Sequence, residues 1–233
     1  MTTPARAVII NHLASTGLLP VFQHHDAETW MNVIKCAYRN GIRVIEFVHQ
    51  RNTRSIRLFA QIHAVCSFRY PQLLIGAGNV FDASTADQYI QAGAQFISSP
   101  LLHEEVANCC THNNILWIPG SCSKEDASRA QELDAMLVSI MPANIVQPAF
   151  LSVLQEQFPG LNFIPSGLMD LSEKNIRQWF ETGAMCLRIV SPLFPKESIA
   201  IKDWVKIEQQ IITTRTVISL VRKSIQKEKN LVS

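Results

Sequence analysis

Two charged residues interrupt runs of sequence that are otherwise apolar. Glu46 lies within the apolar run 44–48, and Arg188 lies within the apolar run 186–190. A carboxylate buried in such a run costs several kcal/mol unless it is paired or protonated. Two interpretations of Glu46 follow and stay open. It is half of a structural ion pair, with Arg188 or Arg51, or it is a general acid or base whose pKa burial raises.

The other reactive side chains form no set with a familiar spacing. His24, His49 and His103 could join Glu46 around a metal ion, but their spacing matches no metal-binding motif, so we expect no metal. Cys122 follows a predicted strand at a helix start, where a thiolate is favoured. No histidine base stands beside it in the sequence, and we do not expect a cysteine nucleophile.

Short apolar runs that alternate with amphipathic segments must position these residues. The runs are continuously apolar, which is typical of parallel strands buried on both faces. Eight strand–helix units in 233 residues predict a TIM (β/α)8 barrel, a single domain over residues 1–233 with a short leading helix. An open doubly wound sheet remains the alternative from the pattern alone. The predicted strands are Leu18–Phe22, Arg43–Val48, Leu73–Gly76, Gln95–Ser98, Leu116–Pro119, Met136–Met141, Asn162–Ile164 and Met185–Val190.

Helix boundaries follow from capping residues and from the spacing of apolar positions. Asp26, Ser123 and Ser172 are predicted to cap the helices that they precede. A helix is predicted over Val146–Gln157, and closing C-terminal helices over Ile201–Val221, followed by a basic, solvated tail. In either fold the loops after the strands form the functional face, so residues at the carboxyl ends of strands are the candidates for chemistry.

Composition narrows the class of protein. The chain is 47% hydrophobic and 17% charged, and its formal charge of +2 is too small to indicate a nucleic acid or membrane partner. The most apolar window, residues 135–154, is broken by Pro142 and Pro148 and is therefore no membrane span. Six cysteines without metal-binding spacing, and a start without the apolar core of a signal peptide, predict free thiols and a cytoplasmic location.

Seven short motifs, one near each of seven strand ends, together resemble the KDPG/KHG aldolase family. These class I aldolases act on 2-keto-3-deoxy-6-phosphogluconate and 4-hydroxy-2-oxoglutarate. The resemblance spans residues 10–195 and implies a TIM barrel, a homotrimer, and a carbon–carbon lyase for a small 2-keto acid that needs no metal or organic cofactor. The motifs are Leu19–Val21, Gly41–Glu46, Ile75–Val80, Ala92–Pro100, Ile118–Gly120, Met141–Ala143 and Ile164–Gly167.

The same resemblance assigns the catalytic positions. Glu46 fills the position of the family's proton-shuttling glutamate. The lysine that forms a Schiff base with the substrate belongs three residues before Pro142, and that place holds Ser139. A protonated imine is an electron sink that permits carbon–carbon cleavage, and a hydroxyl cannot form one. The resemblance thus implies a site that has kept its acid and lost its nucleophile.

The substrate-binding positions also depart from the family pattern. The arginine that grips the keto-acid carboxylate becomes Gln50, with Arg51 one place on, and a threonine becomes Asn79. One glycine pair of the phosphate loops becomes Gly167-Leu168 after Ser166, and the other becomes Ile189-Val190 before Ser191, which removes close backbone approaches to a phosphate. By resemblance the substrate-binding residues are Gln50, Arg51, Asn79, Pro100, Ser166, Gly167 and Ser191.

Three functions therefore stay open. The first is an aldolase whose lysine has moved, for which Lys124 after the fifth strand is the candidate. The second is a non-catalytic barrel that binds a small acid or a protein partner. The third is proton transfer next to a carbonyl, with Glu46 as base and Arg188 as electrophilic partner. In each enzymatic case the expected ligand is a 2-keto acid or a related anion.

Overall fold

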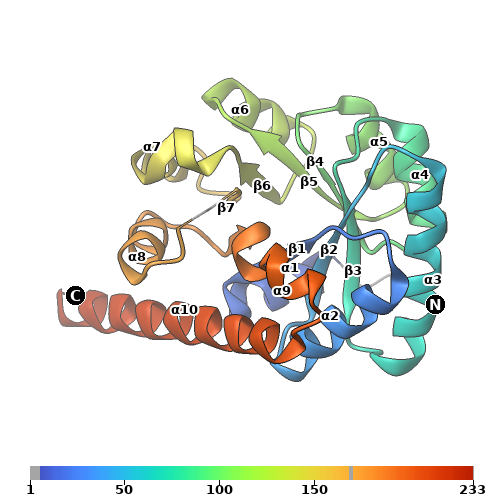
Figure 1. The fold of residues 1–233 in the computed structure, drawn as a ribbon. Helices are drawn as coiled ribbons and strands as arrows, with labels where there is room; N and C mark the ends of the chain where they lie inside the picture. Colours follow the sequence, from blue (N-terminus) through green and yellow to red (C-terminus); the bar gives the residue numbers. More distant parts are fainter. Residues whose placement is uncertain (1–5, 168–169, 233) are drawn as a thin grey trace.

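The computed structural model describes residues 6–167 and 170–232, and it forms a TIM barrel (Figure 1). The eight strands pair in parallel in the order β7-β6-β5-β4-β3-β2-β1-β8, and β7 and β8 meet at an isolated bridge between Ser166 and Arg188. This closure confirms the barrel and rules out the doubly wound sheet. The strands are β1 (Leu18–Phe22), β2 (Val44–Val48), β3 (Leu74–Gly78), β4 (Phe96–Ser99), β5 (Leu116–Ser121), β6 (Leu137–Ile140), β7 (Asn162–Pro165) and β8 (Leu187–Ile189).

The predicted capping residues begin the helices between the strands. Asp26 accepts a hydrogen bond from the backbone N–H of Thr29 at 2.8 Å, and Ser123 and Ser172 cap their helices in the same way. Each cap satisfies an N–H that the helix itself leaves unpaired. The helices are α1 (Arg6–Thr16), α2 (Ala27–Arg39), α3 (Thr53–Arg69), α4 (Ala83–Gln91), α5 (Glu104–His112), α6 (Lys124–Glu132), α7 (Ala143–Gln157), α8 (Glu173–Glu181), the 3-10 helix η1 (Ser191–Leu193), α9 (Lys196–Ala200) and α10 (Trp204–Val232).

The strands separate two apolar cores. Alternate side chains of each strand point inward and form a compact inner cluster, which Ile9 and Leu13 of α1 close at the amino ends of the strands. The larger cluster lies between the strands and the ring of helices. The inner cluster holds Ile9, Leu13, Leu19, Val44, Leu74, Phe96, Leu116, Ile118, Leu137, Ile164 and Cys186.

Helix α7 differs from the helix predicted over Val146–Gln157. It starts at Ala143, and it is broken at Gln147, whose φ of 62° and ψ of 156° lie outside the helical region. The ring of Pro148 disfavours helical backbone at the residue before it, which accounts for a break at this position. The apolar window over 135–154 thus forms β6 and this interrupted helix. Within the described residues, no helix has both the length and the apolar character of a membrane span.

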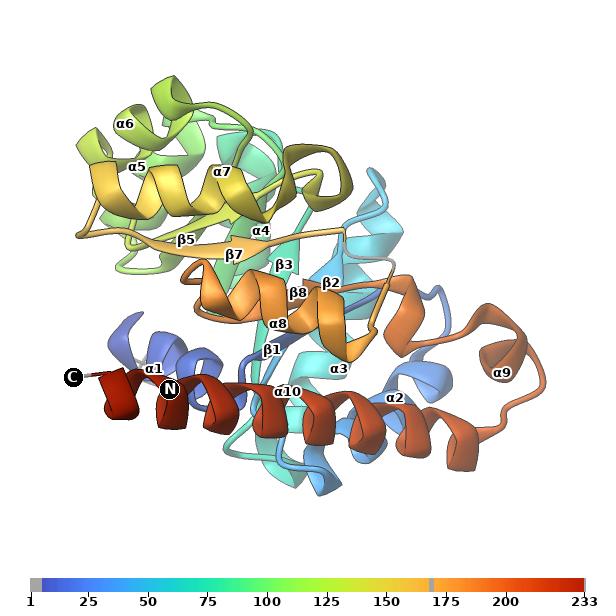
Figure 2. The same cartoon turned by 90° about the vertical axis from the view of Figure 1, so that its left-hand side faces the viewer.

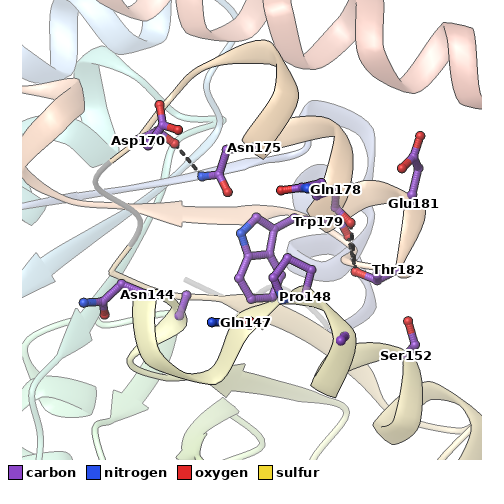
Figure 3. Close-up of a pocket in the computed structure, with 12 residues that line it drawn as sticks. Asn144, Gln147, Pro148, Ser152, Asp170, Asn175, Gln178, Trp179, Glu181 and Thr182 are labelled. Atoms are coloured by element: carbon purple, nitrogen blue, oxygen red, sulfur yellow. Dashed lines mark hydrogen bonds between the residues drawn. The ribbon is translucent and has the colours of Figure 1, made fainter.

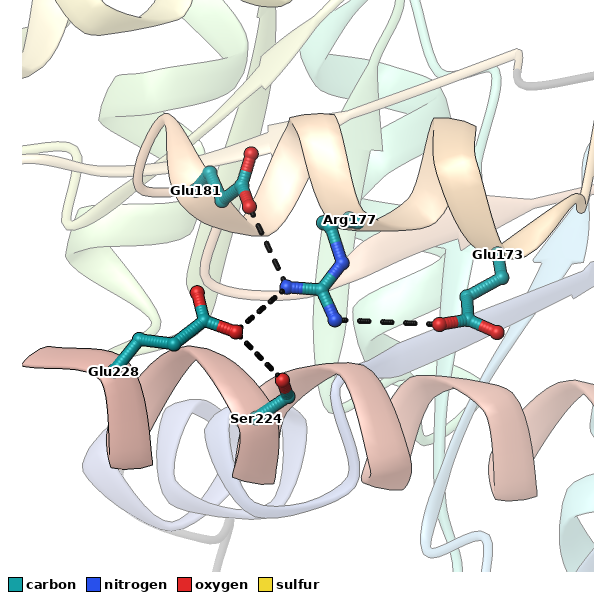
Figure 4. A network of polar contacts seen from close by, with 5 residues as sticks. All are labelled: Glu173, Arg177, Glu181, Ser224 and Glu228. Carbon is teal, nitrogen blue, oxygen red and sulfur yellow. Dashed lines mark hydrogen bonds and ion pairs between the residues drawn. The ribbon is translucent and has the colours of Figure 1, made fainter.

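The closing helix α10 is longer than predicted, because it continues past Val221 to Val232 where a solvated tail was expected. Buried Ile218, Val221 and Ile225 extend its apolar face along the barrel (Figure 2). Arg177 of α8 also forms ion pairs with two carboxylates of its own helix and with Glu228 of α10 (Figure 4). The carboxylates are exposed, so these ion pairs add little to stability, and apolar burial holds α10 in place.

Candidate functional site

The two charged residues that interrupt apolar runs form one buried ion pair inside the barrel. Arg188 donates from Nε to Oε2 of Glu46 at 2.8 Å and from Nη2 to Oε1 of the same carboxylate. Its third nitrogen, Nη1, donates to the hydroxyl of Ser166. Of the two partners predicted for Glu46, the structure selects Arg188. The two parallel hydrogen bonds occupy both carboxylate oxygens.

Strand register brings these residues together from distant parts of the sequence. Glu46 pairs with Val21 of β1, and Arg188 pairs with Leu19 of the same strand, so β1 separates them by one strand. Glu46 follows Val44 by two residues, and Arg188 follows Cys186 by two. Since Val44 and Cys186 belong to the inner cluster, the alternation of strand side chains turns both charged groups inward as well.

The Glu46 carboxylate lies directly over the backbone of β3. A Cβ atom added at Gly78 would stand 1.7 Å from Oε1 of Glu46, a distance that no side chain could tolerate. The glycine that ends β3 thus provides the space into which the carboxylate extends. Because Gly78 belongs to a motif of the resemblance, the sequence already marked this position, although not the reason for it.

Burial and the charge of Glu46 have opposite effects on the pKa of Arg188. Glu46 is fully buried, and Arg188 is 9% exposed. Burial lowers the pKa of the Arg188 guanidinium, but the charge and hydrogen bonds of Glu46 outweigh it, and the pKa is raised. Arg188 is therefore a permanent cation. The arrangement thus compensates the charge of Glu46 inside the barrel and leaves Arg188 only slightly exposed.

Ser139 lies in the same interior but outside this network. It belongs to β6, between Gly120 of β5 and Ile164 of β7, and it is 1% exposed. Its hydroxyl is buried without a hydrogen-bond partner. In the part of the chain that the structure describes, no lysine is hydrogen-bonded or ion-paired to Ser139 or Glu46. Lys124 is the exposed first residue of α6, in the outer ring of helices.

The predicted substrate-binding residues after β2 and β3 do not converge on the ion pair. The Asn79 amide donates to the carbonyl of His49 at 2.9 Å and so ties two loops together. Arg51 is exposed, with its guanidinium 4.2 Å from the ring centroid of Phe81. Gln50 instead donates to the carbonyl of His24 in the β1–α2 loop, at 3.3 Å. The side chains of Gln50 and Arg51 thus contact different loops.

The remaining predicted residues are divided between the interior and the rim. Ser166 contacts Arg188, whereas Ser191 is exposed at the start of η1. Gly167 has a φ of 87°, and a Cβ added there would meet nothing within 4 Å. The carbonyl of Pro100 would stand 2.0 Å from a Cβ at Gly120, so this loop packs tightly on β5. Leu168, the other half of the altered glycine pair, lies outside the described residues.

Three cavities lie near the ends of the strands, and none of them is lined by Glu46, Ser139 or Arg188. The first, about 740 Å³, lies between α7 and α8, where Trp179 faces Pro148 beside the break in α7 (Figure 3). The second, about 510 Å³, lies where β1 and β8 end, and Gln50 and Ser191 are among its lining residues. The third, about 550 Å³, lies after β2 and β3, where Arg51 and His49 line it. Two predicted substrate-binding residues therefore meet at the second cavity.

The second cavity also contains Lys196, a residue that sequence reasoning did not select. Lys196, the first residue of α9, lines it together with His24 and His25 of the β1–α2 loop. The two histidines were visible as polar residues after a strand. Lys196 follows Pro195 on a helix of five residues, which is too short to produce a periodic signal.

Among the described residues, no three His, Cys, Asp or Glu side chains gather in a set that could hold a metal ion. His49 illustrates the reason. Its Nδ1 lies 2.7 Å from the hydroxyl of Tyr89, which in turn contacts Ser55, so its ring belongs to the packing between the barrel and its helices. Burial lowers the pKa of His49 and raises that of Tyr89 to about 12, which keeps both groups neutral near pH 7.

Comparison with known proteins identifies the family of this chain. The family model for KDPG and KHG aldolase matches residues 9–210. The chain belongs to this family. Its relatives include 2-dehydro-3-deoxy-phosphogluconate aldolase of Treponema pallidum, 27% identical over 84% of this chain and 90% of the relative. KHG/KDPG aldolase of Escherichia coli is 23% identical over 84% of this chain and 89% of the relative.

Solved structures of the aldolase family share the fold. KDPG aldolase from Legionella pneumophila, with pyruvate captured as a covalent carbinolamine intermediate, superposes with a TM-score of 0.78. The two chains are 22% identical, and the match covers 88% of this chain and 97% of the other. The family barrel is thus present nearly in full, with a buried Glu46–Arg188 pair inside it.

The geometry predicts different effects on stability at two interior positions. Glu46→Gln leaves the Arg188 guanidinium buried without its carboxylate, and we expect the free energy of unfolding to fall by about 3–5 kcal/mol. Ser139→Ala removes a buried hydroxyl that has no partner, so we expect no loss, and a gain of up to about 1 kcal/mol. Denaturation in urea, extrapolated to water, measures both. A Glu46→Gln protein within about 1 kcal/mol of the unmodified chain would contradict the buried pair.

Proposed function

We propose that this chain binds a small 2-keto acid or a related anion at the mouth of its barrel and forms no imine with it. One observation carries the proposal: Arg188 donates to both oxygens of Glu46, in a pair that is almost entirely buried. A carboxylate held in this way would have to part from Arg188 before it could exchange a proton with bound water. Membership of an aldolase family supports a small keto acid as the class of ligand.

The identity of residue 139 supports the same conclusion. By resemblance this position carries the imine-forming lysine, and Ser139 has a hydroxyl that contacts no polar group. Carbon–carbon cleavage in the manner of a class I aldolase requires an amine within reach of the keto carbon. Lys124, the candidate for a relocated amine, is exposed at the start of an outer helix. A lyase reaction through this lysine is therefore the less favoured reading.

Reductive trapping distinguishes binding from imine chemistry. The chain is incubated with pyruvate and sodium borohydride, and its intact mass is measured. We expect no covalent adduct, because the position that the resemblance assigns to the imine-forming amine holds Ser139. Ser139→Lys is the matched variant, since it places an amine at the position that the resemblance assigns to it. An adduct on the unmodified chain that Lys124→Ala abolishes would establish a relocated lysine and overturn the proposal.

A second candidate is proton transfer next to a carbonyl, and the contact between Glu46 and Arg188 favours it specifically. A carboxylate beside a guanidinium is the pairing that removes a proton while stabilising the developing enolate. A bound keto acid would have to part the two groups, which exchange two hydrogen bonds here. This requirement ranks the second candidate below simple binding.

Exchange of the pyruvate methyl protons for deuterium tests the second candidate without assuming a product. In D2O buffer, proton NMR follows the decay of the methyl signal with and without the chain. We expect no acceleration over buffer, because the ion pair stays closed. Acceleration that Glu46→Gln abolishes and Ser139→Ala preserves would instead assign proton transfer to Glu46.

The resemblance and the composition support proposals for the compartment, oligomeric state, cofactors and partners of the protein. We propose a cytoplasmic homotrimer that needs no metal or organic cofactor and has neither nucleic acid nor membrane as partner. The described cysteines are free, and four of the six are buried, which suits a reducing compartment. Burial raises the pKa of the Cys66 thiol to about 12, so this thiol is unreactive packing material.

A further inference from the structure

We propose that the cavity where β1 and β8 end binds a small carboxylate with an apolar body, held by Lys196 and His24. The inference rests on the proposed function, because it gives the location and the chemistry of the bound anion. It places the anion beside α9, at the rim of the barrel, and not beside Glu46 and Arg188 on the axis.

The charge of the cavity selects an anion. Every titratable side chain that lines it is basic, namely Lys196, His24 and His25, and none of the described lining residues carries a carboxylate. Lys196 takes part in no ion pair among the described residues, whereas nearby Lys202 is paired with Glu28 at 3.4 Å. The ammonium of Lys196 is therefore available to a ligand, and a carboxylate is the group that it would recognise.

His24 adds a hydrogen-bond donor of fixed position. Its Nδ1 accepts the backbone N–H of Asp26 at 3.1 Å, and since a backbone amide can only donate, the neutral ring carries its proton on Nε2. Its carbonyl accepts from Trp30 at 3.1 Å and from Gln50 at 3.3 Å. Three hydrogen bonds thus hold this loop in place before any ligand arrives.

The rest of the cavity lining is mainly apolar, with two phenylalanine rings among aliphatic side chains. Phe22 meets Phe194 edge to face at 5.0 Å between ring centroids, and Ile199 of α9 lines the cavity beside them. The His24 ring lies parallel to that of Phe22, at an interplanar angle of 5°. A volume of about 510 Å³ exceeds what a three-carbon keto acid needs and suits a ligand with a larger apolar body.

The absence of an arginine at position 50 agrees with a carboxylate bound at this cavity. By resemblance that position grips the keto-acid carboxylate, and here it holds the neutral Gln50, whose amide already bonds to His24. Lys196 lies outside every motif of the resemblance, at the start of α9, which follows β8 and η1. The cation that the site lacks at Gln50 is thus supplied across the cavity, from Lys196.

Titration calorimetry with two matched probes tests the inference. Phenylpyruvate carries a carboxylate on an aromatic body, and phenylacetone has the same body with a methyl group in place of the carboxylate. We expect phenylpyruvate to bind, phenylacetone to bind at least about tenfold more weakly, and Lys196→Ala to weaken phenylpyruvate by about tenfold or more. Lys196→Glu reverses the charge and should abolish binding. Lys206→Ala removes an exposed lysine that does not line the cavity, and it should leave binding unchanged.

The outcomes separate this inference from the proposed function. Phenylpyruvate binding that both Lys196 variants leave unchanged would place the ligand elsewhere, which overturns the site and leaves the proposed function standing. Equal binding of the two probes would overturn the requirement for a carboxylate. If neither pyruvate nor phenylpyruvate binds, the proposed function fails and this inference fails with it. Unchanged melting temperatures of the lysine variants confirm that folding is not the cause.

Discussion

One buried ion pair constrains the interior of this barrel. A charge removed from water needs a partner of opposite sign, and Glu46 obtains it from Arg188, two strands away. The carboxylate has room because Gly78 carries no side chain. Arg188 also bonds to Ser166, the residue with which it forms the bridge between β7 and β8. The same side chain thus neutralises the interior charge and joins the seam of the ring.

The pair changes what a barrel of the KDPG and KHG aldolase family can do. The barrel interior, by resemblance the place where a substrate meets its lysine and glutamate, holds the Glu46–Arg188 pair and an unpartnered Ser139. A cavity with basic side chains lies instead at the rim, where Lys196 and His24 share the lining with apolar side chains and two phenylalanine rings. We interpret the chain as a family member that has kept the scaffold and the class of ligand but not the imine chemistry.

Much of the fold could be predicted from the sequence, because apolar runs, helix caps and the number of strand–helix units are local signals. The partner of Glu46 could not be predicted, because the sequence is equally compatible with Arg188 and Arg51. Only the strand register shows that Arg188 lies within reach, and Arg51 contacts Phe81 instead. The break at Gln147 was marked by Pro148, but its effect on the course of α7 depends on packing. Lys196 gave no signal, because its role comes only from the proximity of α9 to the β1–α2 loop.

A crystal structure of the chain soaked with phenylpyruvate tests the central claim most directly, because it shows the pair and the ligand together. The account predicts density for the carboxylate beside Lys196, with both hydrogen bonds between Glu46 and Arg188 intact. Density on the barrel axis, with Arg188 turned away from Glu46 and onto the ligand, would contradict it. Such a result would return the site to the centre of the barrel and make the ion pair a gate that the substrate opens.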